Sequence, residues 1–344
     1  MIFPPIVSAQ ENNHALLTSL IKSYYRVGNS WDTPPPLPCP RSKLSKADIS
    51  LSIRHKIWPA LSALSECNFE REAYAALTQY HASYRKHRVK LQLTLASLGE
   101  ELQRHKVEVL LLKGDAFQRD LYRDRVRPFT DIDLLVPERH TVVVGSLFRE
   151  LGFRQSGSVL IAPDGIEVDM HGAFPGVYSD NFLTFEEVWK QRKLLYSGLF
   201  TLPAKLQLVV ALLHGAKHRW SKLIYLVDLV LTYERSENEH GSSEVQKYLS
   251  QLGLLRSFNV AANLAQDVFE DRSLFRGIGQ GSMMSRVVAT WLRKRLFVKV
   301  KNSLFQRSIG IPVTIYLSHR GSGVIRYSLN RVCRSFKTRR AGLI

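Results

Sequence analysis

Two aspartates one residue apart interrupt an apolar run in the segment RPFTDIDLLV. Residues two apart in a β-strand point to the same face, so Asp131 and Asp133 would share a face. The segment IEVDMH places Asp169 and His171 on one polar face by the same spacing. If the two strands are neighbours in one sheet, the carboxylates of Asp131, Asp133 and Asp169 converge on a single point.

Three converging carboxylates repel one another unless a proton or a cation neutralises them. Mg²⁺ prefers oxygen ligands and binds to a few carboxylates together with substrate phosphates. Two such ions would activate an attacking hydroxyl and stabilise a leaving pyrophosphate. We therefore expect Asp131, Asp133 and Asp169 to bind two Mg²⁺ or Mn²⁺ ions. The structural alternative is that Asp131 caps a turn after Thr130 and Asp133 pairs with a nearby arginine.

A small sheet is needed to position these residues. VEVLLLKG is a short, nearly all-apolar run that stops at Gly114, which is typical of a buried central strand. DAFQRDLYRD suits a short helix, FTDIDLLV a second strand, and PERHTVVVGSLFRELGF a helix bounded by proline and glycine. VLIAPDGIEVDMHG predicts a hairpin that turns at Asp164 and Gly165. The order α-β-α-β-α-β-β indicates a mixed sheet over roughly residues 90–175.

Helical patterns precede and follow this sheet, so the expected fold class is α+β (mixed α/β), a small sheet flanked by N-terminal and C-terminal helical regions. Five prolines in seven residues mark a stiff linker before the first long helical stretch. We divide the chain into an N-terminal helical segment (1–31), a Pro-rich linker (32–44), a helical region (45–90), a sheet-containing core (91–200), a helical domain (201–271) and a basic C-terminal tail (272–344).

The composition allows a packed core and argues against several classes of protein. The chain has 344 residues, of which 45% are hydrophobic and 23% charged. Cys39, Cys67 and Cys333 are far apart and match no metal-ligand spacing, so we expect no disulfides and no zinc. The start shows no signal-peptide pattern, and no apolar run approaches the roughly 18 residues of a membrane span. We expect a cytoplasmic protein.

The net charge of +18 is concentrated at the C-terminal end. From Arg272 onward there are 16 Lys/Arg and no Asp/Glu, whereas the preceding residues hold 32 basic and 30 acidic side chains. Three interpretations are open for residues 285–340: a solvated extension, an amphipathic segment on an anionic membrane surface, and an arm that binds RNA or another polyanion. The second would make the protein peripheral to a membrane.

The joint pattern resembles a known family. LLLKGDAFQRDLYRDRVRPFTDIDLLV, followed by LGF and VDMH, is similar to the DNA-polymerase-β-like nucleotidyltransferase superfamily. More narrowly it resembles the uncharacterised nucleotidyltransferase family, whose hallmark is Lys-Gly followed by Arg-x-x-x-Asp-x-Asp. LLHGAKHRWSKLIYLVDL resembles the helical half of that family, and the resemblance covers about Leu91 to Tyr233. It implies a nucleotidyltransferase-type sheet and a metal-dependent transfer of NMP from an NTP, with ATP expected, to an acceptor hydroxyl.

Residue by residue, the resemblance implies that Asp131 and Asp133 ligate both metals and that Asp169 polarises the acceptor hydroxyl. It also implies four candidates for nucleotide binding: Lys113, Gly114, Arg127 and Thr130. Gly114 would open the turn where a phosphate approaches a helix N-terminus. Many relatives have Gly-Ser there, whereas this chain has Asp115, so Lys113 would supply the phosphate contact as a point charge. The structural alternative for Arg127 is a pair with Asp124.

The helical half offers further polar side chains. On one continuous helix, His218 and Asp228 would each lie within about 40° of His214, so all three could line one face. The H-x-x-x-H spacing suggests zinc, but Gly215 stands where zinc proteases carry glutamate. Two interpretations are open for these residues: packing against the sheet, or closing over nucleotide or acceptor. His171 is likewise open between a site residue and a hydrogen-bond donor at a strand end.

The expected function is thus a nucleotidyltransferase that releases pyrophosphate and modifies an acceptor such as a peptide, a saccharide or another biosynthetic intermediate. Two rivals remain. One is a catalytically silent fold that binds RNA or membrane through the basic tail, and the other is a toxin-like enzyme that modifies tRNA or a protein. Metal-dependent NTP binding distinguishes the enzyme from the silent fold.

Overall fold

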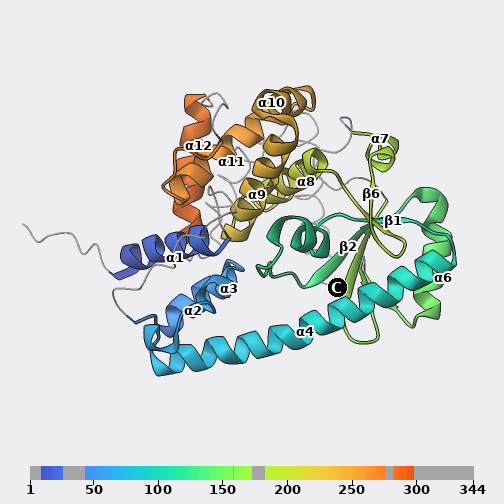
Figure 1. Cartoon of the computed structure of the whole chain (residues 1–344), viewed down its shortest axis with the longest axis horizontal. Helices are drawn as coiled ribbons and strands as arrows, with labels where there is room; N and C mark the ends of the chain where they lie inside the picture. Colours follow the sequence, from blue (N-terminus) through green and yellow to red (C-terminus); the bar gives the residue numbers. More distant parts are fainter. Residues whose placement is uncertain (1–8, 26–42, 158, 173–182, 276–281, 298–344) are drawn as a thin grey trace, which may run out of the picture.

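The computed structural model describes residues 9–25, 43–157, 159–172, 183–275 and 282–297. Figure 1 shows the arrangement of the helices and strands over these ranges. Most of the predicted Pro-rich linker and of the basic tail lies outside them, so the predicted polyanion or membrane contact of residues 285–340 stays a prediction.

The seven described strands form one mixed sheet in the order β3-β4-β5-β2-β1-β7-β6. The central strand β2 is parallel to β5 and antiparallel to β1, while β1 is parallel to β7. The predicted hairpin is the antiparallel pair β4 and β5; β3 and the β6–β7 hairpin had not been predicted. The strands are β1 (Val109–Leu111), β2 (Asp131–Leu135), β3 (Arg154–Ser156), β4 (Val159–Ile161), β5 (Glu167–His171), β6 (Lys193–Tyr196) and β7 (Leu199–Thr201).

Helices surround the sheet and form a second half of the molecule, which confirms the predicted α+β class (Figure 1). None of the helices within the described ranges combines the length and apolar character needed to cross a bilayer. The helices are α1 (Ala9–Tyr25), α2 (Lys46–Arg54), α3 (Trp58–Leu61), η1 (Glu66–Asn68), α4 (Arg71–Arg104), α5 (Asp115–Phe117), η2 (Gln118–Tyr122), η3 (Glu138–His140), α6 (Thr141–Glu150), α7 (Phe185–Lys190), α8 (Ala204–Lys217), α9 (Leu223–His240), α10 (Ser242–Gln251), α11 (Leu255–Val268) and α12 (Met283–Phe297).

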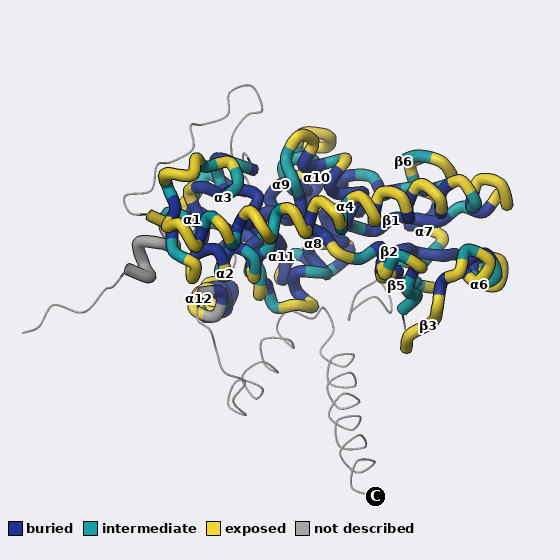
Figure 2. The backbone as a smooth tube through the Cα atoms, turned by 90° about the horizontal axis from the view of Figure 1, so that it is seen from below, coloured by how far each residue is buried: buried dark blue, intermediate teal, exposed yellow. Residues whose placement is uncertain are grey.

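The helix α4 joins the two halves. Its 34 residues span about 50 Å, and it runs from the side of α2 and α3 to the sheet (Figures 1 and 2). Leu77 and Tyr84 in its first half are buried in the hydrophobic cluster of the helical half. Leu91 and Leu98 in its second half are buried in the cluster beneath the sheet. The boundary predicted at residue 90 therefore falls inside one continuous helix that serves both cores.

The stretch expected to be one helical face around His214 and Asp228 is two helices. α8 ends at Lys217, Arg219 and Trp220 adopt left-handed backbone with φ of 51° and 50°, and α9 begins at Leu223. The Trp220 ring packs on Gly215, where any Cβ would collide with it. His214 and Asp228 consequently lie on different helices, and the prediction of a common face was wrong for Asp228.

The helix α12 lies within the range that had been predicted as basic tail. It packs against α11 through its buried residues Val288, Ala289 and Leu292. The Arg54 guanidinium donates to the Leu296 carbonyl at 2.8 Å, which ties α2 to α12. The N-terminal helices and the last described helix are thus parts of one helical half.

Candidate active site

Parallel pairing of β2 and β5 places Asp133 directly beside Asp169. His171 follows on the same polar face of β5, and its Nε2 lies 3.4 Å from Asp133 Oδ1 and 3.6 Å from Asp169 Oδ2. One ligand atom from each of these three residues lies within 4.8 Å of the others. The two carboxylates are ligands that Mg²⁺ and Mn²⁺ prefer, whereas an imidazole is more usual around other transition metals, so the carboxylates are the part of this group that fits the expected metal.

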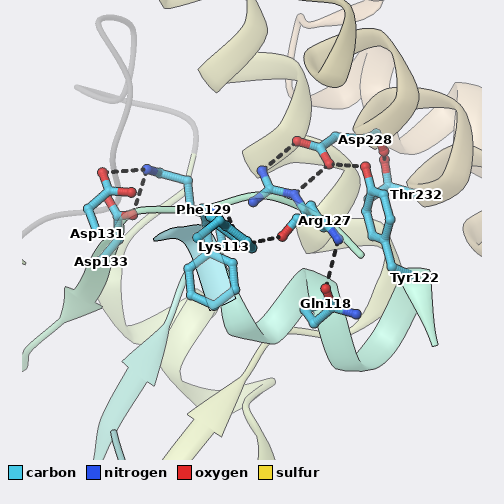
Figure 3. A network of polar contacts seen from close by, with 10 residues as sticks. Lys113, Gln118, Tyr122, Arg127, Phe129, Asp131, Asp133, Asp228 and Thr232 are labelled. Carbon is cyan, nitrogen blue, oxygen red and sulfur yellow. Dashed lines mark hydrogen bonds and ion pairs between the residues drawn. The ribbon is translucent and has the colours of Figure 1, made fainter. Parts of the chain in front are cut away.

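Lys113 lies between the two aspartates of β2 (Figure 3). Its Nζ is 2.5 Å from Asp133 Oδ2 and 3.8 Å from Asp131 Oδ2. The position follows from the sheet, because the Leu112 amide just before it donates to the Asp133 carbonyl at 3.1 Å. The Lys113 ammonium therefore compensates both charges. Asp131 reaches this ammonium but is not part of the three-residue group with Asp169 and His171.

Asp133 is buried, whereas the Asp131 and Asp169 side chains are 42% and 41% exposed. Burial alone would raise the pKa of Asp133, but the hydrogen bond with His171 and the charge of Lys113 outweigh it and lower the pKa to about 2. Asp133 is therefore ionised at neutral pH, the form that binds a cation. The Asp131 and Asp169 carboxylates are the more exposed of the three, and both line the cavity described below.

The turn at Gly114, directly after Lys113, brings the backbone close to the start of β2. Gly114 has φ of 63°, and a Cβ there would lie 3.1 Å from the Phe129 ring, so glycine is required. Asp115 is buried, and its Oδ2 accepts hydrogen bonds from Arg119 Nε at 2.7 Å and from the Tyr196 hydroxyl at 3.2 Å. The acidic group that replaces the serine of many relatives is therefore held by these two side chains and does not line the cavity.

Replacing Asp115 should consequently affect folding and not nucleotide binding. We expect Asp115→Asn to lower the free energy of unfolding by about 1–3 kcal/mol, because two hydrogen bonds lose their charged acceptor. Nucleotide affinity should stay at the wild-type value. Urea unfolding and calorimetric titration of ATP measure the two quantities, and a large loss of ATP affinity at unchanged stability would instead place Asp115 in the site.

A cavity of about 370 Å³ opens beside the aspartates of β2 and β5 and is lined by residues from both halves of the molecule. The sheet half contributes Lys113, Gly114, Thr130, the aspartates of β2 and β5, and His171. The helical half contributes three lysines that had not been predicted as site residues: Lys56, Lys217 and Lys222. The first of these lies outside the segment that carried the resemblance, and no spacing in the sequence distinguishes the other two from surface lysines.

His214 and His218 also line the cavity, where their ring centroids are 4.7 Å apart and both contact Tyr225. Burial and then the nearby charge of Lys113 lower the pKa of His214 to about 2. Burial and the adjacent Lys217 lower the pKa of His218 to about 4. Both imidazoles are therefore neutral at neutral pH, and among the described residues no third metal ligand lies beside them.

Arg127 and Asp228 form a buried pair behind the cavity (Figure 3). Arg127 Nε and Nη2 donate to the two Asp228 oxygens, each at 2.7 Å, and the Tyr122 hydroxyl donates to Asp228 Oδ1 at 2.6 Å. Burial alone would lower the pKa of Arg127, but Asp228 raises it overall. Asp124, which the structural alternative had given to Arg127 as its partner, pairs instead with Arg125 at 2.8 Å, and its side chain is 56% exposed.

This pairing bears on two predicted site residues, Arg127 for nucleotide binding and Asp228 for the substrate side. Arg127 reaches the cavity wall, but its guanidinium is bound in bidentate fashion to Asp228. Asp228 had been a substrate-side candidate, and it lies outside the cavity lining with its carboxylate satisfied by Arg127 and Tyr122. The pair joins α9 to the loop before β2, so it fixes the helical half against the sheet.

Comparison with known protein families gives a match over most of the described chain. A family model described as "Uncharacterised nucleotidyltransferase" matches residues 47–270, a span that includes every cavity residue named above. No curated protein and no solved structure matches the chain. The matched span begins well before Leu91, so it includes α2 and α4 as well as the sheet.

Proposed function

This chain belongs to the uncharacterised nucleotidyltransferase family, and from that premise we propose that it transfers a nucleoside monophosphate from an NTP to an acceptor hydroxyl and releases pyrophosphate. The observation that supports it best is the register of β2 and β5, which sets Asp133 beside Asp169 at a cavity that also contains Lys113 and the Gly114 turn. The proposed donor is ATP, and the proposed acceptor is a peptide, a saccharide or another biosynthetic intermediate in the cytoplasm.

Asp131, Asp133 and Asp169, with His171 beside them, would hold the two Mg²⁺ or Mn²⁺ ions, which supply positive charge to the α-phosphate and the leaving pyrophosphate. Asp169 lies beside Asp133, is partly exposed and lines the cavity, so it would accept the proton of the acceptor hydroxyl. The acceptor oxygen then forms a bond to the α-phosphorus. The bond from the α-phosphorus to the oxygen that bridges to the β-phosphate breaks, and this oxygen leaves with the pyrophosphate. Lys113 lines the same cavity, and its ammonium would contact the phosphates as a point charge.

Label transfer tests this proposal without knowledge of the acceptor. The full chain would be incubated with cell extract, Mg²⁺ or Mn²⁺, and ATP labelled at either the α- or the γ-phosphate. Nucleotidyl transfer predicts that only the α-label becomes attached to an acceptor and that chelation of the metal stops it. Extract without the protein is the control, and attachment of the γ-label that depends on the protein would show phosphoryl transfer instead and would end this proposal.

The role of Asp169 has its own test. We expect Asp169→Asn to lower turnover far more than ATP affinity, because a proton acceptor acts only in the reacting complex. Rates of α-label transfer at saturating ATP measure the first quantity, and calorimetric titration of ATP with Mn²⁺ measures the second. Normal turnover with weakened ATP binding would assign Asp169 to binding of the nucleotide rather than to activation of the acceptor.

A further inference from the structure

Three lysines from separate segments meet at the wall of the cavity. Lys56 follows α2, Lys217 is the last residue of α8, and Lys222 immediately precedes α9. Within the described part of the chain, no carboxylate forms an ion pair with any of them. Lysine ammonium groups that face a cavity without a protein partner are suited to an anionic ligand.

Specific contacts hold Lys56 at this place. The buried His55 accepts a hydrogen bond at Nδ1 from the Leu223 amide at 3.2 Å, and its carbonyl accepts one from the Ile224 amide at 3.3 Å. The end of α2 is therefore fixed to the first turn of α9, next to Lys222. This contact joins residues 168 positions apart in the chain.

The backbone at Lys56 is unusual for its residue type. Its φ is 57°, and the Lys56 and Ile57 amides donate to the Ile53 and Ser52 carbonyls, which closes the end of α2 as a left-handed cap. Glycine is the residue most often found at such a position, because a side chain there costs conformational energy. Lys106 closes the end of α4 with the same left-handed cap, so the cap fixes where Lys56 lies, and it is the cavity beside Lys56 that distinguishes the two lysines.

The charges around Lys56 also favour binding of an anion. Burial, followed by the positive charges of Arg127 and Lys222, lowers the pKa of Lys56 to about 8. Asp131 acts in the opposite direction but does not offset these effects. A polyphosphate beside these lysines would supply the missing negative charge.

We propose that Lys56, Lys217 and Lys222 form a polyphosphate subsite that binds the β- and γ-phosphates of the NTP, with Lys56 contributed by the helices that precede the sheet. This inference rests on the proposed function only in naming the NTP as the source of the polyphosphate. Three cations from three segments match a chain of linked phosphates better than a single phosphate group. The carboxylates of β2 and β5 and the three lysines would then act on opposite ends of the scissile bond.

Binding of inorganic triphosphate tests the subsite apart from catalysis. The full chain would be titrated with triphosphate by calorimetry in EDTA at moderate salt. We expect binding by the wild type and a roughly 10- to 100-fold weaker affinity for Lys56→Met and for Lys222→Met, the loss of one charge-assisted contact each. Lys247→Met, which removes the same charge from an exposed position on α10, is the matched control and should bind normally.

A second variant separates charge from folding. Lys56→Gly removes the ammonium and relieves the left-handed backbone, so it should be at least as stable as the wild type and yet lose triphosphate affinity. Unchanged triphosphate binding in Lys56→Gly and Lys222→Met would overturn the subsite and leave the proposed transfer reaction intact. Lysine-dependent triphosphate binding in a protein that transfers no α-label would support the subsite while the proposed function failed.

Discussion

Asp133→Asn is expected to abolish nucleotidyl transfer while the protein stays folded. Asparagine has the shape of the aspartate but lacks the charge that would bind the metals, so several kcal/mol of transition-state stabilisation are lost and turnover falls by roughly 10³-fold or more. Asp131→Asn should act in the same direction. Turnover is measured by α-label transfer, and Mn²⁺ affinity is measured independently by electron paramagnetic resonance of the free ion.

Acid unfolding provides the control for this variant. The pKa of Asp133 is depressed to about 2 in the folded protein, below the value of about 4 in an unfolded chain. Its charge therefore stabilises the fold above about pH 4, and this contribution is lost as the pH falls towards 2. Asp133→Asn should make stability less dependent on pH in that window. Wild-type turnover in Asp133→Asn would refute the metal site at β2 and β5.

Asp228→Ala is expected to destabilise the protein by about 3–5 kcal/mol, because it leaves the Arg127 guanidinium buried without a counter-ion. The Tyr122 hydroxyl would lose its acceptor at the same time. Equilibrium unfolding in urea, followed by circular dichroism, measures the change. Loss of activity should follow from loss of folded protein, so the stability measurement has to accompany any assay.

Two further variants locate the cause of that destabilisation. Asp124→Ala breaks the exposed pair with Arg125 and should cost less than about 1 kcal/mol. The double variant Arg127→Met/Asp228→Leu removes both buried charges and should recover much of the stability that Asp228→Ala loses. If Asp228→Ala is no more harmful than Asp124→Ala, the buried pair does not hold the two halves of the molecule together.

The sheet and its carboxylates were predictable because the signal is local. Alternation with a period of two assigned Asp131 and Asp133 to one face, and a short turn at Asp164 marked the hairpin that β4 and β5 form. That the two strands are neighbours was assumed, and the structure confirms it, whereas the parallel register that sets Asp133 beside Asp169 had not been predicted.

The remaining features depend on contacts between distant segments. Arg127 pairs with Asp228 at a separation of 101 residues, whereas the only structural partner considered from the sequence was the nearby Asp124. No proline marks the break between α8 and α9 in the sequence. The break is accompanied by packing of the Trp220 ring against Gly215, which no local pattern predicts. Lys56 lines the cavity next to His55, which binds to α9 across 168 positions of the chain. Local patterns carry no information about such pairings.

The long helix α4 has a consequence for how a ligand would be received. Its two ends are buried in different cores, so a hinge between the sheet and the helical half would have to bend a continuous helix or pull one end out of its core. The Arg127–Asp228 pair resists the same displacement. The two walls of the cavity are thus pre-organised, and the protein loses little conformational entropy when a highly charged ligand binds between them. Selectivity for the ligand would then come from the fixed distance between the aspartates of β2 and β5 on one side of the cavity and the three lysines on the other.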